Sequence, residues 1–350
     1  MAPLAPSLRR FRLHACYVII LIMVAFIMRR VAGMLILIFG VNFAAFAYAH
    51  YGRYAQLENN PIFTRQEEVL PVFPFYNEYI QGVLSGNPAE MPSAAGLTVL
   101  DMLETAAGAS LGLLSIAFTV SLALGLFLGL QAAKTEPPRV SRWLIPLSTM
   151  SLAMPGFYVG AALITISVLY LFLSPSSKGD LPFPLGGFGW DAHLVFPVVA
   201  LSFRPTLQIA QMSASLLTDE FNKTYVTVAR GLGHSWRMVK VKTALRNIFV
   251  PMLQVIASSI SLMIGELILV EWLFGWPGLG RQLALSIQPP QTVTIASGVL
   301  PSSYLHAPTV ATVVTALGAA LIISNTLAGI LTYFSDPRLQ THPHGGANAD

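Results

Sequence analysis

Two ionisable side chains lie inside long apolar stretches of this 350-residue chain. Arg204 stands midway along an apolar run over 193–217, and Glu266 stands within another over 248–273. Charged groups in such runs are costly and are functional candidates by default. Two interpretations are open. The two side chains form a structural ion pair inside a helix bundle, or Arg204 binds a carboxylate and Glu266 an amine of a solute that carries both groups.

Motifs for phosphate or zinc chemistry are absent from the sequence. It contains no Gly-x-x-x-x-Gly-Lys-Ser/Thr loop and no His-Glu-x-x-His pair. Cys16 is the only cysteine, which excludes an intramolecular disulfide and a thiolate metal cluster. We therefore expect no catalytic residue, no metal site and no cofactor bound by this chain. A membrane-embedded enzyme is the weak alternative, because Arg204 and Glu266 are the only candidates for buried ionisable groups and no nucleophile–base pair accompanies them.

The composition is typical of a membrane protein. Hydrophobic residues make up 54% of the chain and charged residues 10%, and the mean hydropathy is +0.65. Water-soluble globular proteins do not have this balance. The net charge of +4 comes from basic residues dispersed between lipid-length segments, which argues against nucleic acid as a partner.

Six apolar segments are each near the length that a helix needs to cross a bilayer, and they predict an all-α integral membrane protein. They cover approximately 31–50, 106–133, 143–173, 193–217, 248–273 and 308–334. Residues 1–30 precede them, and we interpret this region as a basic and apolar leader, interfacial or helical, that runs into the first span. An extra span and a true start at Met28 are the alternatives.

The basic residues indicate which side of the membrane each loop occupies. An even number of spans puts both termini on one side, where 15 of the 20 Lys and Arg residues then fall, against four on the other. The positive-inside bias makes that side cytoplasmic. Residues 51–105, which are acidic and interrupted by prolines, become an external subdomain. Residues 218–248 become a cytoplasmic loop, and 335–350 a cytoplasmic tail.

Local signals refine this outline. Pro155-Gly156 predicts a kink in the third span, because proline removes one backbone hydrogen bond and clashes with the preceding turn. In the basic loop, Tyr225 to Leu232 predicts a short helix, Gly233 a turn, and Ser235 the cap of a second helix that runs toward Pro251.

Three stretches resemble one family. The pattern Thr227-Val228-Ala229, Gly233, Thr243 to Asn247 and Pro251 resembles the EAA loop of ABC-importer permeases, in particular the dipeptide/oligopeptide branch. The stretch Glu271-Trp272-Leu273-Phe274-Gly275-Trp276-Pro277-Gly278-Leu279-Gly280-Arg281 is similar to that family's Glu-x-x-Phe-x-x-Pro-Gly-(Leu/Ile)-Gly. Ser335-Asp336-Pro337-Arg338 resembles its terminal Asp-Pro-(Arg/Lys). The likeness runs from about Phe26 to Leu339.

The resemblance implies a fold and a set of site residues. Residues 31–334 would form a six-helix permease domain of the type I ABC importer kind. The loop over 218–248 would dock into an ATPase subunit through Tyr225, Ala229, Arg230, Gly233, Arg237, Arg246, Asn247 and Pro251. Arg204 and Glu266 are candidates for the substrate pathway because they are ionisable groups within spans, and Arg204 is an addition to the family's pattern. The gate region would be shaped by Glu271, Trp272, Pro277, Gly278 and Gly280.

The resemblance also implies partners. They are a sister permease subunit in a heterodimer, two ABC ATPase subunits that hold ATP and Mg, and an external substrate-binding protein. The setting would be the lipid of the plasma (inner) membrane of a prokaryote, with this chain a transport subunit and not an enzyme. Di- and oligopeptides are the expected substrates. Nickel chelates, glutathione and oligosaccharides are alternatives in the same class, and an ATP-independent carrier or channel is a weaker one.

Overall fold

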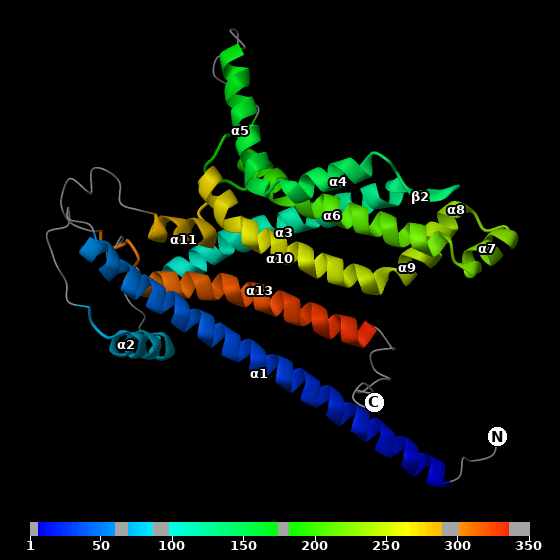
Figure 1. Ribbon diagram of the computed structural model, residues 1–350, viewed down its shortest axis with the longest axis horizontal. Coiled ribbons are helices and arrows are strands. Elements are labelled where there is room, and N and C mark those ends of the chain that lie inside the picture. Colours follow the sequence, from blue (N-terminus) through cyan, green and yellow to red (C-terminus); the bar gives the residue numbers. More distant parts are fainter. Residues whose placement is uncertain are drawn as a thin grey trace.

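The computed structural model is built from long helices joined by short connections (Figure 1). It describes residues 6–59, 69–86, 98–173, 181, 183–288 and 301–335, and side chains within these ranges from Val24 to Thr332, residues 26 and 59 excepted. The helices and strands are α1 (Pro6–Asn59), α2 (Val72–Ser85), α3 (Val99–Ala132), β1 (Ala133–Thr135), β2 (Pro138–Val140), α4 (Leu144–Ala153), α5 (Gly156–Leu173), η1 (Ala192–Leu194), α6 (Val195–Phe221), α7 (Thr224–Gly231), α8 (Trp236–Met238), η2 (Val239–Ala244), α9 (Leu245–Asn247), α10 (Phe249–Phe274), α11 (Leu279–Ile287) and α13 (Ala307–Ser335).

Six of the helices in the described residues are long and apolar enough to cross a membrane, which confirms the predicted fold class. They are Ile27–Glu58, Val99–Ala132, Gly156–Leu173, Ala192–Phe221, Phe249–Phe274 and Ala307–Thr332. The backbone of residues 6–30 continues directly into the first of them, so the leader and the first span form the single helix α1. Residues 60–68 and 87–97 of the predicted external segment, and the tail from 336, lie outside the described residues.

The third predicted span is two helices. α4 ends at Ala153, Met154 is extended with φ −111° and ψ 107°, and α5 begins at Gly156. Proline disfavours helical backbone in the residue before it, so Pro155 forces Met154 out of the helix. The expected kink is therefore a complete break. It lets α4 lie along α6 while α5 rises away from the other helices (Figure 1).

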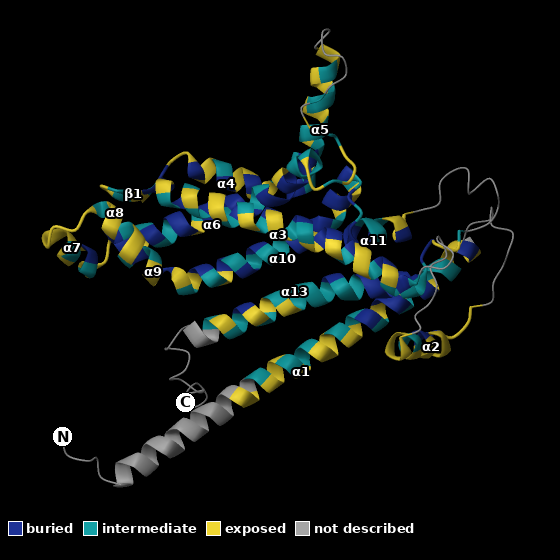
Figure 2. Ribbon diagram, turned by 180° about the vertical axis from the view of Figure 1, so that it is seen from behind, coloured by how far each residue is buried: buried dark blue, intermediate teal, exposed yellow. Residues whose placement is uncertain are grey.

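α3 and α6 pack most closely in the bundle. A Cβ on Gly125 would lie 2.9 Å from the carbonyl oxygen of Thr206, and one on Gly129 would lie 2.9 Å from that of Ala210. The two glycines therefore let the helix backbones approach, as small-xxx-small pairs do in membranes. Buried residues gather where α3, α6, α10 and α11 meet, whereas α5 is intermediate or exposed along most of its length (Figure 2).

The bundle has two distinct ends. α7, α8 and α9 lie together at one end, beside the β1–β2 hairpin, and α2 and α11 lie toward the other (Figure 1). α1 begins and α13 ends on the side that carries α7–α9 (Figure 1). The basic loop, the start of α1 and the end of α13 thus share one side of the molecule.

Candidate coupling loop, ion pair and gate

The basic loop folds as a helix, a turn and a second helical segment. α7 is followed by Gly233 with φ +86°, a left-handed conformation that glycine adopts without strain. Ser235 then accepts a hydrogen bond from the backbone nitrogen of Met238 at 3.3 Å and caps the second segment. That segment continues as α8, the π-helix η2 and α9, and Pro251 lies in the first turn of α10, where a proline is tolerated.

A buried carboxylate, which the sequence patterns did not single out, fastens this loop to the bundle. Glu220 at the end of α6 accepts a hydrogen bond from the Tyr225 hydroxyl at 2.5 Å and one from the Asn247 amide at 3.3 Å, and it also pairs with Lys223. Burial and the hydrogen bond to Glu220 raise the pKa of Tyr225 to about 12. Tyr225 and Asn247 therefore hold α7 and α9 on the end of α6, which makes the loop a rigid projection.

The base of the loop is an aromatic and cationic cluster. Trp236 packs edge-on against Phe221, donates to Glu136 of the hairpin turn at 2.6 Å, and lies under the guanidinium of Arg230 at 4.8 Å. Lys240 donates to the carbonyl of Ala133 at 2.7 Å, and burial lowers its pKa. These contacts tie the loop to the α3–hairpin junction.

The tip of the loop is exposed. Arg237 and Arg246 are exposed and form no hydrogen bond or ion pair with the described residues, whereas Arg230 donates to the carbonyl of His234 at 2.7 Å. Val228 of α7 and Leu232, which directly follows α7, present apolar side chains to solvent and are 56% and 74% exposed, whereas Ala229 is half-buried. A fixed helix with apolar and cationic side chains at its tip is suited to seating in a groove on another protein.

Arg204 and Glu266 meet inside the bundle. The guanidinium of Arg204 donates to Oε1 of Glu266 at 3.1 Å, and Oε2 of Glu266 accepts from the backbone nitrogen of Gly156 at 3.0 Å. The carboxylate thus joins α6 to the first residue of α5, directly after the helix break. Within the described residues, Nε of Arg204 is buried without a hydrogen-bond partner.

We expect Arg204→Gln to destabilise the protein by about 3 kcal/mol, because breaking a buried pair leaves an uncompensated charge. Arg204→Gln/Glu266→Gln should recover part of this loss, and the thermal unfolding midpoints of the purified variants measure it. If the pair also binds solute, the double variant will be stable and present in membranes but deficient in transport. Unchanged stability and unchanged transport of every solute in Arg204→Gln would exclude both roles.

The gate stretch is a helix reversal built around a second buried carboxylate. Glu271 is 0% exposed. It accepts from the Ser110 hydroxyl at 2.6 Å and from the backbone nitrogen of Gly280 at 2.7 Å. Its side chain therefore caps the start of α11, where free backbone N–H groups favour a carboxylate. Ser110 itself accepts from the nitrogen of Leu279 at 2.8 Å.

The glycines of the gate stretch allow close packing, whereas its two tryptophans differ in burial. A Cβ on Gly278 would lie 2.0 Å from Oε1 of Glu271, and one on Gly280 would lie 2.4 Å from the Cα of Ile268. Trp276 is buried and donates to the carbonyl of Ala109 at 3.0 Å, whereas Trp272 is exposed. Pro277, between Trp276 and Gly278, is half-buried.

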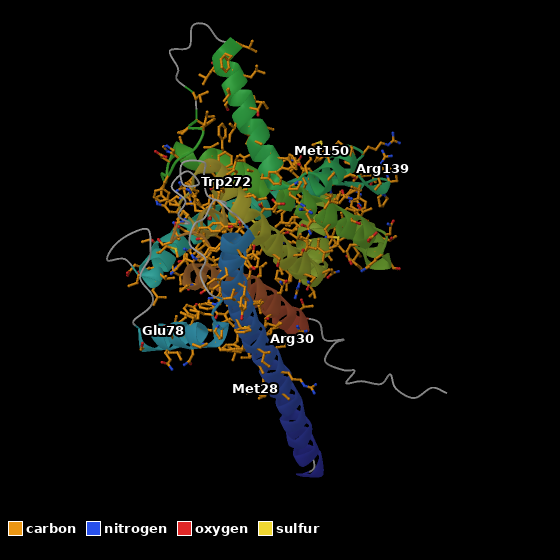
Figure 3. All side chains as sticks on the ribbon, turned by 60° about the vertical axis from the view of Figure 1, so that its left-hand side comes forward. Met28, Arg30, Glu78, Arg139, Met150 and Trp272 are labelled. Atoms are coloured by element: carbon orange, nitrogen blue, oxygen red, sulfur yellow. The ribbon has the colours of Figure 1, made fainter. Side chains whose placement is uncertain are left out.

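Figure 3 places Trp272 near the foot of α5 and Arg139 at the hairpin, so the gate stretch and the basic loop occupy opposite ends of the bundle.

Ser110 also lies in a sequence with the spacing of a nucleophile elbow, Gly108-Ala109-Ser110-Leu111-Gly112. Such an elbow is a sharp strand-to-helix turn that exposes the serine. Here the five residues are in the interior of α3, and Ser110 is buried and bonded to Glu271. Its geometry is that of a packing contact. Within the described residues, no group of three or more His, Cys, Asp or Glu side chains is arranged to hold a metal ion.

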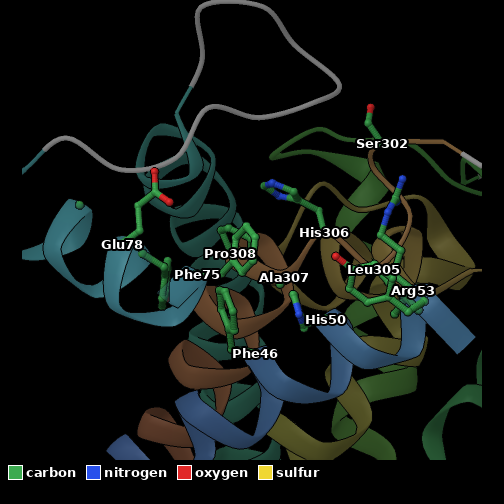
Figure 4. Close-up of a pocket in the computed structure, with 13 residues that line it drawn as sticks. Phe46, His50, Arg53, Phe75, Glu78, Ser302, Leu305, His306, Ala307 and Pro308 are labelled. Carbon is green, nitrogen blue, oxygen red and sulfur yellow. The ribbon is translucent and has the colours of Figure 1, made fainter. Parts of the chain in front are cut away.

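A cavity of about 430 Å³ lies at the gate end, between α1, α2 and the segment before α13 (Figure 4). His50, Arg53, Glu78 and His306 are among its lining residues. Arg53 donates to the carbonyls of Pro301 and Tyr304 at 2.8 and 2.6 Å, which fixes that segment on α1. Burial and the nearby charge of Arg53 lower the pKa of His306 to about 4.

We expect this histidine to make stability depend on pH. Its folded pKa lies below the ordinary value of about 6.5, so the unfolded chain binds the proton more readily. Stability is then complete above about pH 6.5 and is lost as the pH falls toward 4, by about 2–3 kcal/mol. Thermal unfolding in detergent between pH 7 and pH 4 measures the loss. His306→Gln should flatten the dependence, and the exposed His234→Gln should not. Equal slopes for the wild type and His306→Gln would contradict the assignment.

The six long helices, the projecting loop and the capped helix reversal define an integral membrane protein of the permease class. Residues 121–341 match the family described as binding-protein-dependent transport system inner membrane component, and the chain belongs to that family. The Asp336-Pro337-Arg338 part of the terminal motif lies outside the described residues.

Similar proteins from other organisms extend the match. The chain is 26% identical over 317 residues to the dipeptide transport system permease protein DppB of Escherichia coli K12, an alignment that covers 79% of this chain and 92% of the relative. It is 25% identical over 273 residues to the DppB of Lactococcus lactis, covering 76% and 87%. It is 23% identical over 337 residues to the peptide transport system permease protein SapB of Salmonella typhimurium, covering 90% and 97%.

Proposed function

We propose that this chain is half of the membrane pathway of an ATP-driven, binding-protein-dependent importer for di- or oligopeptides. The observation that carries the proposal is the rigid loop that Glu220 fastens to α6, with Val228 and Leu232 exposed at its tip. A loop of this kind can transmit force only if it is held rigidly and if it presents a surface that binds the partner subunit. The names of the relatives supply the substrate class.

The partners follow from this role. Two ATPase subunits would hold ATP and Mg and receive the loop. A sister permease would complete the pore, since six helices of one chain form half of it, and an external binding protein would deliver the solute. The loop side, with the start of α1 and the end of α13, would face the cytoplasm of a prokaryotic cell, because it holds the excess of Lys and Arg.

The substrate is tested by uptake of a radiolabelled dipeptide in cells that lack this chain and in the same cells with the chain restored. We expect uptake only in the restored cells, and competition by an excess of other unlabelled peptides. Uptake that is unaffected by the chain would overturn the peptide assignment. A nickel chelate, glutathione and an oligosaccharide, labelled and tested in parallel, would then identify the alternative solute.

A further inference from the structure

A cluster of positive charge lies on the β1–β2 hairpin, at the loop end of the bundle. Lys134 of β1 and Arg139 of β2 are directly opposite each other in the antiparallel register, and both are exposed. Arg142, two residues after the end of β2, is exposed as well. We call these three residues the hairpin cations. Within the described residues, none of them forms an ion pair.

This arrangement is unfavourable without a counter-ion. Residues directly opposite in an antiparallel pair have Cβ atoms roughly 5 Å apart, and like charges there are destabilising. Glu136 in the hairpin turn does not compensate Lys134 or Arg139, because its carboxylate accepts a hydrogen bond from the indole of Trp236 at 2.6 Å. Burial and the charge of Lys134 lower the pKa of Lys240, so a fourth cation is close. A negatively charged ligand would therefore stabilise the hairpin.

The hairpin cations stand where two apolar helices reach the polar side of the membrane. β1 directly follows α3, a candidate membrane span, and the apolar helix α4 begins two residues after Arg142. Between them, Trp143 is 45% exposed, and tryptophan beside basic residues is typical of the membrane–water interface. The exposed side chains of α3 and α4 include Phe127 and Ile145. The hairpin cations therefore lie at the depth of the lipid head groups.

An acidic phospholipid matches both parts of this surface. Its phosphate carries the negative charge that the hairpin cations require, and its acyl chains suit the apolar side chains exposed on α3 and α4, such as Phe127 and Ile145. A soluble anion would use the charges alone. An ATPase subunit would seat on the tip of the coupling loop, whereas the hairpin contacts the base of that loop through Trp236.

We infer that the hairpin cations bind the head group of an acidic glycerophospholipid in the cytoplasmic leaflet. The inference rests on the proposed function for the orientation of the chain, and it adds a lipid partner. The hairpin is joined to the base of the coupling loop by the Trp236–Glu136 hydrogen bond and by the hydrogen bond from Lys240 to the carbonyl of Ala133. A lipid that holds the hairpin thus also steadies the loop, so coupling depends on acidic lipid.

Thermal unfolding of the full-length chain, purified in a neutral detergent, tests the site without transport. Each basic residue near an anionic membrane surface strengthens binding about fivefold, and a ligand that binds the folded state raises the unfolding midpoint. We expect phosphatidylglycerol added to the micelles to raise the wild-type midpoint further than the same amount of phosphatidylcholine does. Equal responses of the wild type to the two lipids would overturn the inference.

Two triple variants sharpen this measurement. Lys134→Gln/Arg139→Gln/Arg142→Gln should unfold at or above the wild-type temperature without lipid, because the opposed charges are gone, and should lose most of the extra response to phosphatidylglycerol. Lys134→Arg/Arg139→Lys/Arg142→Lys keeps the three charges and is the matched control, with the wild-type response expected. An undiminished response to phosphatidylglycerol in the glutamine variant would place the lipid elsewhere and refute the site.

The effect on coupling is measured in the complex purified from native membranes and returned to lipid vesicles. ATP-driven peptide uptake by the wild type should be severalfold faster in vesicles that contain phosphatidylglycerol than in phosphatidylcholine alone, and the glutamine variant should show the slower rate in both. Loss of uptake by that variant in both lipids would assign the hairpin cations to an ATPase contact and overturn the lipid assignment. A wild-type complex without uptake in either lipid, with its unfolding response intact, would instead contradict the proposed function.

Discussion

We expect Leu232→Asp to abolish coupled transport, with uptake reduced at least tenfold, while the variant reaches the membrane at the normal level. Leu232 is 74% exposed directly after α7, so the substitution removes little contact within this chain. In a complex, burying an aliphatic side chain contributes about 1.5–3 kcal/mol. Each 1.4 kcal/mol is a factor of ten in binding. An aspartate at a buried contact adds a desolvation cost.

The measurement pairs uptake with co-purification of the ATPase subunits. Leu232→Met keeps the apolar volume and is the matched control, for which we expect normal uptake and normal recovery of partners. Val228→Asp should behave as Leu232→Asp does, because Val228 is exposed on α7, four residues before Leu232. Full coupling in both aspartate variants would show that the tip of α7 does not seat in a partner.

We expect Gly280→Ala to prevent the gate end from folding, so that the protein level in the membrane falls to a small fraction of the wild-type value. The new methyl group would lie 2.4 Å from the Cα and 2.8 Å from the nitrogen of Ile268. Both are backbone atoms of α10, which cannot move away by a rotamer change as a side chain could. Overpacking of this kind costs about 3 kcal/mol, and the hydrogen bond from Gly280 to Glu271 would be disturbed as well.

Gly40→Ala is the control for that experiment. Gly40 lies in the interior of α1 with open space around it, so alanine should leave the level unchanged or raise it through better helix propensity. Membrane levels by immunoblot and thermal unfolding in detergent distinguish the two variants. Wild-type stability in Gly280→Ala would refute the tight reversal between α10 and α11.

Most of this fold could be predicted from the sequence because a bilayer constrains the length and the composition of every helix that crosses it. A bilayer demands about 20 apolar residues for each helix, and backbone groups must be satisfied within it. The segments at 193–217 and 248–273 thus correspond to α6 and α10 within a few residues. The break at Pro155 was predicted only as a kink, because the extended conformation of Met154 depends on how α4 packs along α6.

The site was less predictable, since its key groups act through tertiary contacts. Glu220 is one of two acids in a basic loop, and only the approach of Tyr225 and Asn247 shows that it fastens the loop. Glu271 was placed in the gate by resemblance, but its role as the cap of α11 requires the chain reversal at Gly275–Gly278. Spacing along one chain cannot reveal such contacts.

The central claim is that this chain couples solute passage to ATP hydrolysis in partner subunits. It is tested most directly by purifying the tagged chain from solubilised native membranes, identifying the bound chains and assaying ATPase activity. The account predicts recovery of a sister permease and ATP-hydrolysing subunits, and their loss with Leu232→Asp. Recovery of the intact chain alone, without ATPase activity, would contradict it and leave the loop as a solvated surface of a self-contained carrier or channel.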